Sequence, residues 1–303
     1  MFFEHRAYWL PKDVQDPGRY EDAFEVDAAR GLAAICDGVS TTLFSGRWAG
    51  LLAKAVVEET PDTRDPERLE AWLTKHRAAW AAAVDESALA WHQKPKLLEG
   101  AASTLLWVEL ASSGMQDGVA RPLRLRCYAI GDCCLFHVRG GQVLQTFPVL
   151  DSASFENNPH VLRSVHKRTD TVALEALESA CNPGDLLVLC TDALGAWTLR
   201  QLEAGFPLDW DAFWETTPED WQQWLLGLRQ GNQIRYDDST MLLLRISGRR
   251  PERATPTRKA SDENLMDVAE DKLRGALKSI KGSLRKSLKE LAESKWLKER
   301  DRK

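Results

Sequence analysis

The stretch LAAICDGVS, residues 32–40, carries more information about the fold than any other part of the sequence. The apolar run Gly31–Cys36 has the length and composition of a buried β-strand, and it ends directly at Asp37. Gly38 follows, and glycine lets the backbone approach a ligand closely. An Asp after a strand is most often a turn former or a helix cap. The stretch alone therefore predicts a strand that ends in a carboxylate, without assigning a function to it.

Carboxylates stand beside apolar strand runs at four further places along the chain. The five motifs, in sequence order, are Glu21-Asp22, Asp37-Gly38, Gly131-Asp132, Thr191-Asp192 and Asp237-Asp238. If these side chains converge at one edge of a sandwich, their charges repel and raise each other's pKa values unless cations neutralise them. Carboxylate oxygens suit Mg²⁺ or Mn²⁺ better than Zn²⁺. The six histidines show no ligand spacing, and we expect them at the surface or in loops.

The alternation of strand and helix patterns over the first 248 residues predicts sheets covered by helices. The apolar, β-rich runs are Gly31–Cys36, Ser103–Leu110, Leu123–Ile130, Leu135–Val138, Leu186–Cys190 and Thr240–Ile246. The helical stretches are Phe44–Glu59, Pro66–Trp91 and Asp209–Gln230, the last with a break at Pro218. Helices come in blocks rather than after every strand, which favours antiparallel sheets over a doubly wound parallel sheet. Arg139-Gly140-Gly141 has the composition of a hairpin turn.

The net charge of -5 is unevenly distributed along the chain. Residues 249–303 contain 17 Lys and Arg against 10 Asp and Glu, a net charge of +7, so the preceding 248 residues carry -12. An acidic body does not suit nucleic-acid binding, because phosphate contacts need Lys and Arg. No run reaches the roughly 18 apolar residues of a membrane span, and the first residues lack the pattern of a secretory signal.

A change in composition divides the chain into three predicted regions. Residues 1–247 carry the strand and helix patterns, residues 248–261 form a linker, and residues 262–303 form a basic amphipathic helical tail. Large aliphatic residues recur in the tail at spacings of three and four: Leu273, Leu277, Ile280, Leu284, Leu288 and Leu291. Something must cover this stripe, and the first region, a second copy, a protein partner and an anionic membrane surface all remain open.

The six cysteines lie mostly in apolar strand runs and form no CxxC pair. The neighbours Cys133 and Cys134 would point to opposite faces of a strand. We therefore expect reduced core thiols and a cytoplasmic protein. Cys36 adjoins Asp37, but the alternation of strand faces turns it away from that carboxylate, and a buried thiol is usually inert.

The order of the acidic motifs resembles that of a known family. Glu-Asp, Asp-Gly, the segment Gly100–Thr104, Gly-Asp, Thr-Asp and Asp-Asp-Ser-Thr follow one another as in metal-dependent protein phosphatases of type 2C, in particular the short bacterial forms. The match spans roughly Arg19 to Ile246. The resemblance implies an α+β fold, a four-layer αββα sandwich of two antiparallel sheets flanked by helices, with a metal centre at one end. It also implies a phosphorylated protein substrate and a cognate Ser/Thr kinase as the opposing enzyme.

The resemblance further implies roles for individual residues. Asp37 matches a ligand that bridges two metals, and Gly38 matches a backbone carbonyl ligand. The other matching ligands are Glu21, Asp22, Asp132, Asp192 and Asp237, of which Asp132 is associated with a third ion. Asp238 takes the neighbouring place in the pattern or simply caps the last strand. Two or three Mn²⁺ or Mg²⁺ ions would lower the pKa of a bound water towards about 7, and the resulting hydroxide would attack phosphorus.

Several positions depart from the family pattern. The phosphate-binding Arg four residues before Glu21 falls on Pro17, so we expect Arg19, or else Arg6, to substitute for it. Three further segments differ, namely Val39-Ser40-Thr41 in place of a segment with His or Met, Ala193 in place of Gly, and Cys133-Cys134 in place of Ser-Arg. Two alternatives to an active phosphatase therefore stay open. One is a catalytically weak pseudophosphatase or phosphopeptide-binding module, and the other is a scaffold that acts through its tail.

Overall fold

The computed structural model describes residues 1–85, 89, 91, 94–116, 119–120, 122–155, 159–166 and 172–247 of the 303-residue chain. Met1–Glu252 forms one compact unit. The linker and the basic tail that the sequence predicts at 248–261 and 262–303 lie outside the described residues. Among the helices that are described, none is long and apolar enough to cross a membrane.

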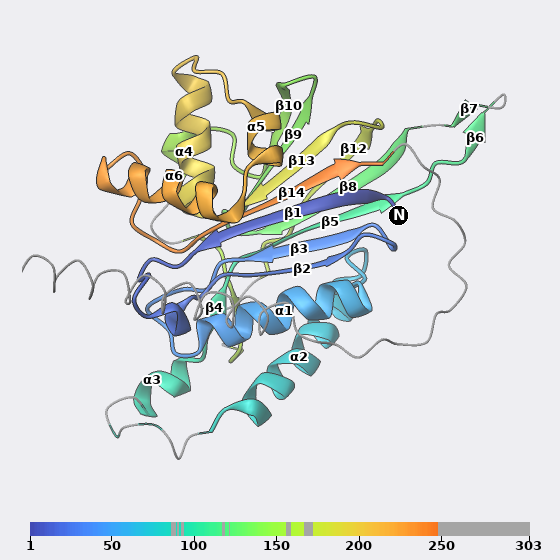
Figure 1. Ribbon diagram of the computed structural model, residues 1–303. Coiled ribbons are helices and arrows are strands. Elements are labelled where there is room, and N and C mark those ends of the chain that lie inside the picture. The colour runs from blue at the N-terminus through green and yellow to red at the C-terminus, as the bar shows by residue number, and fades with distance from the viewer. Residues whose placement is uncertain are drawn as a thin grey trace, which may run out of the picture. The chain divides into compact units, whose positions relative to one another are not determined.

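Two five-stranded antiparallel sheets form the centre of this unit (Figure 1). The first sheet has the order β1 (Phe3–Leu10), β14 (Ser239–Ile246), β13 (Leu186–Cys190), β9 (Cys134–Arg139) and β10 (Gln142–Phe147). The second has the order β12 (Glu175–Cys181), β8 (Leu123–Ile130), β5 (Leu105–Ala111), β3 (Leu32–Cys36) and β2 (Ala23–Asp27). Two short pairs join β4 (Ala102–Ser103) to β11 (Leu162–Arg163) and β6 (Met115–Gln116) to β7 (Val119–Ala120).

Helices cover the outer face of each sheet, which confirms the predicted four-layer arrangement. On the second sheet, α1 (Ser45–Glu59) packs against β2 and β3, with α2 (Pro66–Ala83) against α1 and the short α3 (Lys94–Glu99) further along the chain. On the first sheet, α4 (Asp192–Glu203) contacts β14 and α6 (Pro218–Gln230) contacts β1, with α5 (Trp210–Glu215) beside them (Figure 1). The 3-10 turns η1 (Pro17–Arg19) and η3 (Ser152–Ser154) lie in the connections.

The central strands are buried on both faces, and this explains their continuous apolar runs. In β13, alternate residues divide between two core layers: Leu186, Val188 and Cys190 pack with α4–α6, while Leu187 and Leu189 pack between the sheets. A third layer fills the space between the second sheet and α1 and α2. The helices on the first sheet bury several indole rings, and each such ring removes roughly 150–250 Å² from water.

The cysteines follow the expected pattern. All six are free and buried. Cys133 packs between the sheets and Cys134 packs against the helices, as strand alternation predicts. Cys36 lies in the layer beneath α1. Burial raises the pKa of the Cys36 thiol, so this side chain stays protonated and does not act as a nucleophile at neutral pH.

Most predicted elements are found, and the differences concern one helix end and the edge strands. The predicted helix Asp209–Gln230 is split into α5 and α6, with the Thr217 hydroxyl accepting a hydrogen bond from the Asp220 amide just before Pro218. The helix that begins at Pro66 ends at Ala83, earlier than predicted. The strand patterns missed β1, β2 and β12, which are all edge strands with partly exposed faces, and indicated β10 only through its hairpin turn. The hairpin predicted at Arg139-Gly140-Gly141 is confirmed by the pairing of β9 with β10.

Arg229 of α6 connects three segments next to the acidic end of the sandwich. Its buried guanidinium donates hydrogen bonds to the carbonyl oxygens of Pro11 (2.8 Å), Leu10 (3.2 Å) and Asp237 (2.6 Å). The end of β1 and the turn before β14 are therefore held against the helix layer by one side chain. No apolar residue can satisfy these carbonyl groups, and a buried acceptor without a donor costs about 1–3 kcal/mol.

We therefore predict that Arg229→Met lowers the free energy of unfolding by about 2–4 kcal/mol, because it strands several buried acceptors at once. Urea denaturation followed by tryptophan fluorescence measures this. The matched control is Arg200→Met in α4, whose exposed side chain makes one long hydrogen bond of 3.3 Å to the Gln233 carbonyl. That change should stay within about 0.5 kcal/mol. Equal losses in both variants would contradict the role given to Arg229.

Candidate metal centre

The acidic motifs all lie at one end of the sandwich, because the strand register places them there. Asp37 follows β3, and Asp22 precedes β2, whose first residue pairs with the last residue of β3. In the first sheet, Cys190 pairs with both Cys134 and Met241, so Asp132, Asp192 and Asp237 stand at the same edge. Threonine hydroxyls join the ends of the two sheets. Thr191 and Thr240 of the first sheet donate to Asp22 Oδ2 of the second, at 3.0 and 2.7 Å.

Two buried carboxylate oxygens in this region have no hydrogen-bond donor among the described residues. They are Oδ1 of Asp22 and Oδ1 of Asp192. The other oxygen of Asp192 is paired with Arg235, and the other oxygen of Asp22 accepts from the two threonines. Buried carboxylate oxygens are normally satisfied, so these unpaired ones are open to a water or a cation that the described residues do not supply. Hard, anionic oxygen donors in this number fit Mg²⁺ or Mn²⁺.

Local backbone contacts fix the positions of Asp37 and Gly38. The carbonyl oxygen of Asp37 accepts from the Ser103 hydroxyl and the Thr104 amide, both at 2.9 Å. A Cβ at Gly38 would lie 2.5 Å from the carbonyl oxygen of Glu21, so only glycine fits between these segments. The close approach brings the Asp-Gly motif against the Glu-Asp motif, as the sequence predicts for two parts of one site.

The carboxylates perturb one another strongly. Burial raises the pKa of Asp37 well above its usual range, and the charges of Asp22, Asp192, Asp132 and Asp237 raise it further. Burial and then Asp192 raise the pKa of Asp132 to about 7. Burial raises the pKa of Asp192, which the charge of Arg235 opposes and that of Asp237 raises further. These carboxylates therefore lie within electrostatic range of one another, and a cation among them would lower the cost of ionising them.

The structure thus brings together most of the residues that the sequence singled out. Asp22, Asp37, Asp132, Asp192 and Asp237 share one electrostatic neighbourhood. Glu21 joins them through Lys12, whose ammonium contacts both Glu21 and Asp237. Asp238 accepts from the backbone amides of Lys12 and Glu21, so it orders the surrounding segments in addition to preceding β14. The assignment of individual residues as metal ligands stays a prediction.

Arg19 lies differently from the other predicted site residues. Its side chain is 77% exposed and forms an ion pair with Asp16 at 3.1 Å. Arg6 stacks over the ring of Trp214, on the side of the first sheet that the helices cover. Phosphate binding by Arg19 therefore also stays a prediction. The cations that do touch the acidic cluster are Lys12 and Arg235, which the sequence patterns did not indicate.

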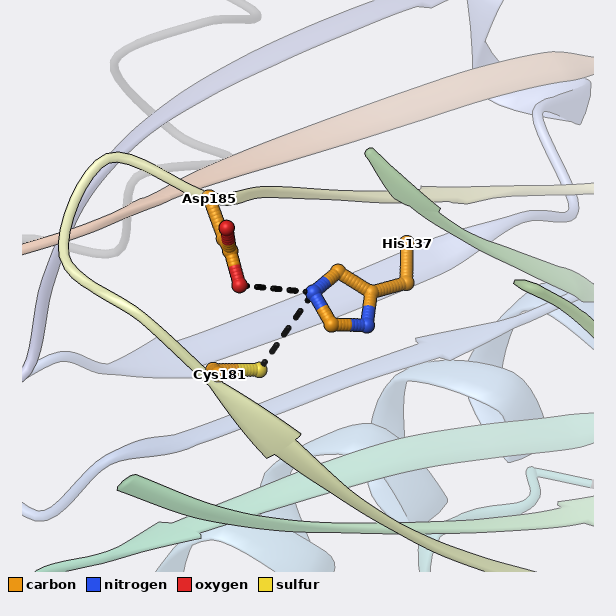
Figure 2. A group of neighbouring side chains, drawn as sticks. All are labelled: His137, Cys181 and Asp185. Carbon is orange, nitrogen blue, oxygen red and sulfur yellow. Dashed lines mark hydrogen bonds and ion pairs between the residues drawn. The ribbon is translucent and has the colours of Figure 1, made fainter. Parts of the chain in front are cut away.

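A second cluster of potential ligands, His137, Cys181 and Asp185, lies at the opposite end of the same strands (Figure 2). Among the described residues, only these three His, Cys, Asp or Glu side chains have ligand atoms all within 4.8 Å of one another. His137 Nε2 lies 2.8 Å from Asp185 Oδ2 and 3.9 Å from the sulfur of Cys181. The carboxylates of the acidic cluster are more widely spaced, so distance alone would favour the cluster of His137, Cys181 and Asp185.

Charge compensation distinguishes the two clusters. Arg139 binds Asp185 through two hydrogen bonds of 2.7 and 2.8 Å, and the Asn182 amide adds another of 2.8 Å. Burial would raise the pKa of Asp185, but these hydrogen bonds and that of His137 outweigh it and lower the pKa. Asp185 is thus already neutralised by the chain. The expectation that the histidines lie at the surface or in loops is wrong for His137 and for His76, which are both buried in regular elements.

Comparison with known proteins agrees with this geometry. The family model described as Protein phosphatase 2C matches residues 15–227. No curated protein matches the sequence. The serine/threonine phosphatase PstP/Ppp of Mycobacterium tuberculosis has 18% identity and a TM-score of 0.51, over 82% of this chain and 100% of that one. Stp1 of Staphylococcus aureus has 15% identity and a TM-score of 0.51, over 82% and 96%.

A structure of the PstP catalytic domain in complex with two manganese ions is also similar, with 17% identity and a TM-score of 0.50 over 81% of this chain and 99% of that one. At such identities the solved structures establish the fold, and the family model establishes the relationship.

The raised pKa values predict how stability depends on pH when a chelator removes divalent metal. A carboxyl whose pKa is higher in the folded state binds more protons there, so stability falls as pH rises from about 4 through the folded pKa. Asp132, with a pKa of about 7, contributes up to about 1.4 kcal/mol per pH unit over that interval. We expect urea denaturation to show this decline between pH 5 and 7.5, and Mn²⁺ to remove it.

Asp132→Asn isolates this contribution, because it removes the titrating group at nearly constant volume. The variant should lose stability less steeply with pH than the original protein in chelator. If both proteins show the same slope, the raised pKa of Asp132 is not a property of the folded state.

Proposed function

The chain belongs to the protein phosphatase 2C family and is a metal-dependent serine/threonine phosphatase, and we propose that the acidic cluster at the end of its sandwich is the catalytic metal centre. One observation carries this placement. Carboxylates from both sheets converge there, and two of their buried oxygens, on Asp22 and Asp192, have no donor among the described residues. The proposed ligands are Glu21, Asp22, Asp37, Gly38, Asp132, Asp192 and Asp237. Two or three Mn²⁺ or Mg²⁺ ions would supply an activated water and stabilise charge on the phosphate oxygens.

Neighbouring residues of the chain hold the proposed metal ligands in position. The Ser103 and Thr104 contacts hold the backbone of Asp37 at the strand end, so its carboxylate needs no reorganisation to reach the centre of the cluster. Thr191 and Thr240 orient Asp22 and leave its second oxygen free of other donors. A thiol nucleophile is not needed, and burial keeps the neighbouring thiols of Cys36 and Cys133 protonated.

The substrate, the opposing kinase and the cellular location are further proposals. We propose that the substrates are phosphoserine and phosphothreonine residues of proteins, phosphorylated by a cognate Ser/Thr kinase, in the cytoplasm. The family relationship supports phosphorylated protein substrates, and the six free thiols support the location. The pseudophosphatase alternative rests on Val39, Ser40 and Ala193. Turnover with Mn²⁺ decides between an active enzyme and this alternative.

We predict that Asp37→Asn and Asp192→Asn each lower kcat for an aryl phosphate and a phosphothreonine peptide by about a hundredfold or more. Each change replaces a charged oxygen donor by a neutral group of nearly the same volume. Calorimetry should show weaker Mn²⁺ binding by both variants. The matched control is Asp211→Asn in α5, where the side chain is 87% exposed and pairs only with Arg245 among the described residues. This control should keep activity and Mn²⁺ affinity.

Asp185→Asn tests the competing cluster with the same chemical change. It should lower stability, because Arg139 and His137 lose a charged partner, while Mn²⁺ affinity stays unchanged. Loss of Mn²⁺ binding in Asp185→Asn but not in Asp37→Asn would move the metal site to the other end of the strands. Full activity of the original protein in excess chelator would exclude the metal mechanism altogether.

We further propose that the basic tail, residues 262–303, docks on a protein partner or an anionic membrane surface. Truncation after Gly248 should leave a folded domain with Mn²⁺-dependent aryl-phosphatase activity, because β14 closes the first sheet between β1 and β13. The truncated protein should lose binding to anionic vesicles or to a partner. Vesicle binding should weaken with salt, since each Lys or Arg near such a surface contributes about 1 kcal/mol. Unfolding on truncation would show that the tail belongs to the core.

A further inference from the structure

Lys12 is placed at the rim of the acidic cluster by contacts from three segments. Its ammonium donates to Glu21 Oε2 at 2.8 Å and to the Ser40 hydroxyl, and it lies 3.9 Å from Asp237 Oδ1. Its backbone amide donates to Asp238 Oδ1 at 2.6 Å. The side chain is 26% exposed, so the ammonium is reachable from solvent while its stem is packed. Lys12 thus stands between the Glu-Asp motif and the Asp-Asp motif.

The charge of the substrate favours a further cation, supplied by the chain, beside the metal ions. A phosphomonoester is anionic, and the carboxylates that hold metal ions repel it. A charge-assisted hydrogen bond from Lys or Arg to a phosphate oxygen offsets that repulsion and fixes the orientation of the phosphate. Arg19 is engaged by Asp16 and is largely in solvent, and Arg235 is paired with Asp192. Lys12 alone among these three contacts two proposed ligands.

Binding of metal ions to the acidic cluster would weaken the contacts of Lys12 with Glu21 and Asp237. Glu21 and Asp237 are both proposed metal ligands, so their negative charge is shared with metal when the site is filled. The ammonium then needs another anion close by, and the flexible four-carbon stem of Lys allows it to turn towards one. Ser40, which replaces a different residue type in the family pattern, holds the ammonium on the side of the Asp-Gly motif.

We propose that Lys12 binds the phosphate group of the substrate at the rim formed by Glu21 and Asp237. This assignment rests on the proposed function of the acidic cluster. It gives Lys12 the role that the sequence pattern assigned to an Arg near Glu21, and it makes Lys12 a residue that touches substrate rather than one that holds metal.

The test compares Lys12→Met, Lys12→Gln and Lys12→Arg with the original protein at saturating Mn²⁺. For the two neutral variants we expect KM for an aryl phosphate, and the inhibition constant of inorganic phosphate, to rise about tenfold. Calorimetric Mn²⁺ affinity should stay equal or increase, because a positive charge beside the ligands is removed. Lys12→Arg should restore most of the phosphate affinity. Lys54→Met, which removes an exposed ion pair with Glu58 in α1, is the matched control and should change none of these values.

Several results would overturn the proposal. Unchanged KM and unchanged phosphate inhibition in both neutral variants would do so. A loss of Mn²⁺ affinity that parallels the rise in KM would show that Lys12 organises the metal ligands instead. A rise in KM with Arg19→Met and none with Lys12→Met would return the role to Arg19.

A failure of the Lys12 proposal can be distinguished from a failure of the proposed phosphatase function. If the original protein shows no metal-dependent hydrolysis, calorimetric binding of inorganic phosphate to the Mn²⁺-loaded protein still tests Lys12. Binding that weakens in Lys12→Met and recovers in Lys12→Arg supports the proposal without turnover. Absence of phosphate binding by the original protein overturns it.

Discussion

The mutual repulsion of buried carboxylates at one end of the sandwich is the constraint on which the rest of the structure depends. Asp22, Asp37 and Asp192 come from three different strand ends, and burial makes each harder to ionise. Hydroxyl donors and two cations, Lys12 and Arg235, compensate for only part of this charge. Without a bound ligand, the repulsion among these carboxylates would only lower the stability of the fold. This repulsion supports the proposal that the cluster holds divalent cations.

The surrounding layers make this arrangement possible by fixing the strand ends. Each central strand is buried on both faces, so its register cannot slip without exposing an apolar face. Gly38 permits the close approach of two motifs, and Arg229 holds the end of β1 and the Asp237 turn against α6. The carboxylates thus stand on a rigid frame, which suits a site whose electrostatics must be organised before substrate binds.

The two ends of β13 differ in a way that shows why residue type is a weaker guide to a metal site than charge compensation. Asp185 and Asp192 flank the same strand, and both are buried. Arg139 and His137 neutralise Asp185 completely, whereas Asp192 keeps an oxygen without a donor among the described residues. The sequence predicted that a strand ends at the Thr191-Asp192 motif, as β13 does, but gave no sign that His137 is buried. A lone histidine in an apolar run does not reveal its partner, because that partner lies on a neighbouring strand.

The sequence by itself determined the central strands, the preference for antiparallel sheets and the acidic residues at the strand ends, because these are local patterns, and the family resemblance supplied the four-layer sandwich. It did not identify the edge strands β1, β2 and β12, whose partly exposed faces weaken those patterns. Only the tertiary structure decided which cations accompany the carboxylates. Lys12 meets Asp238 across 226 residues of sequence, through the pairing of β1 with β14. Arg19, although near in sequence to Glu21, pairs with Asp16 in the same turn, because the local backbone conformation decides which of two nearby carboxylates a side chain meets.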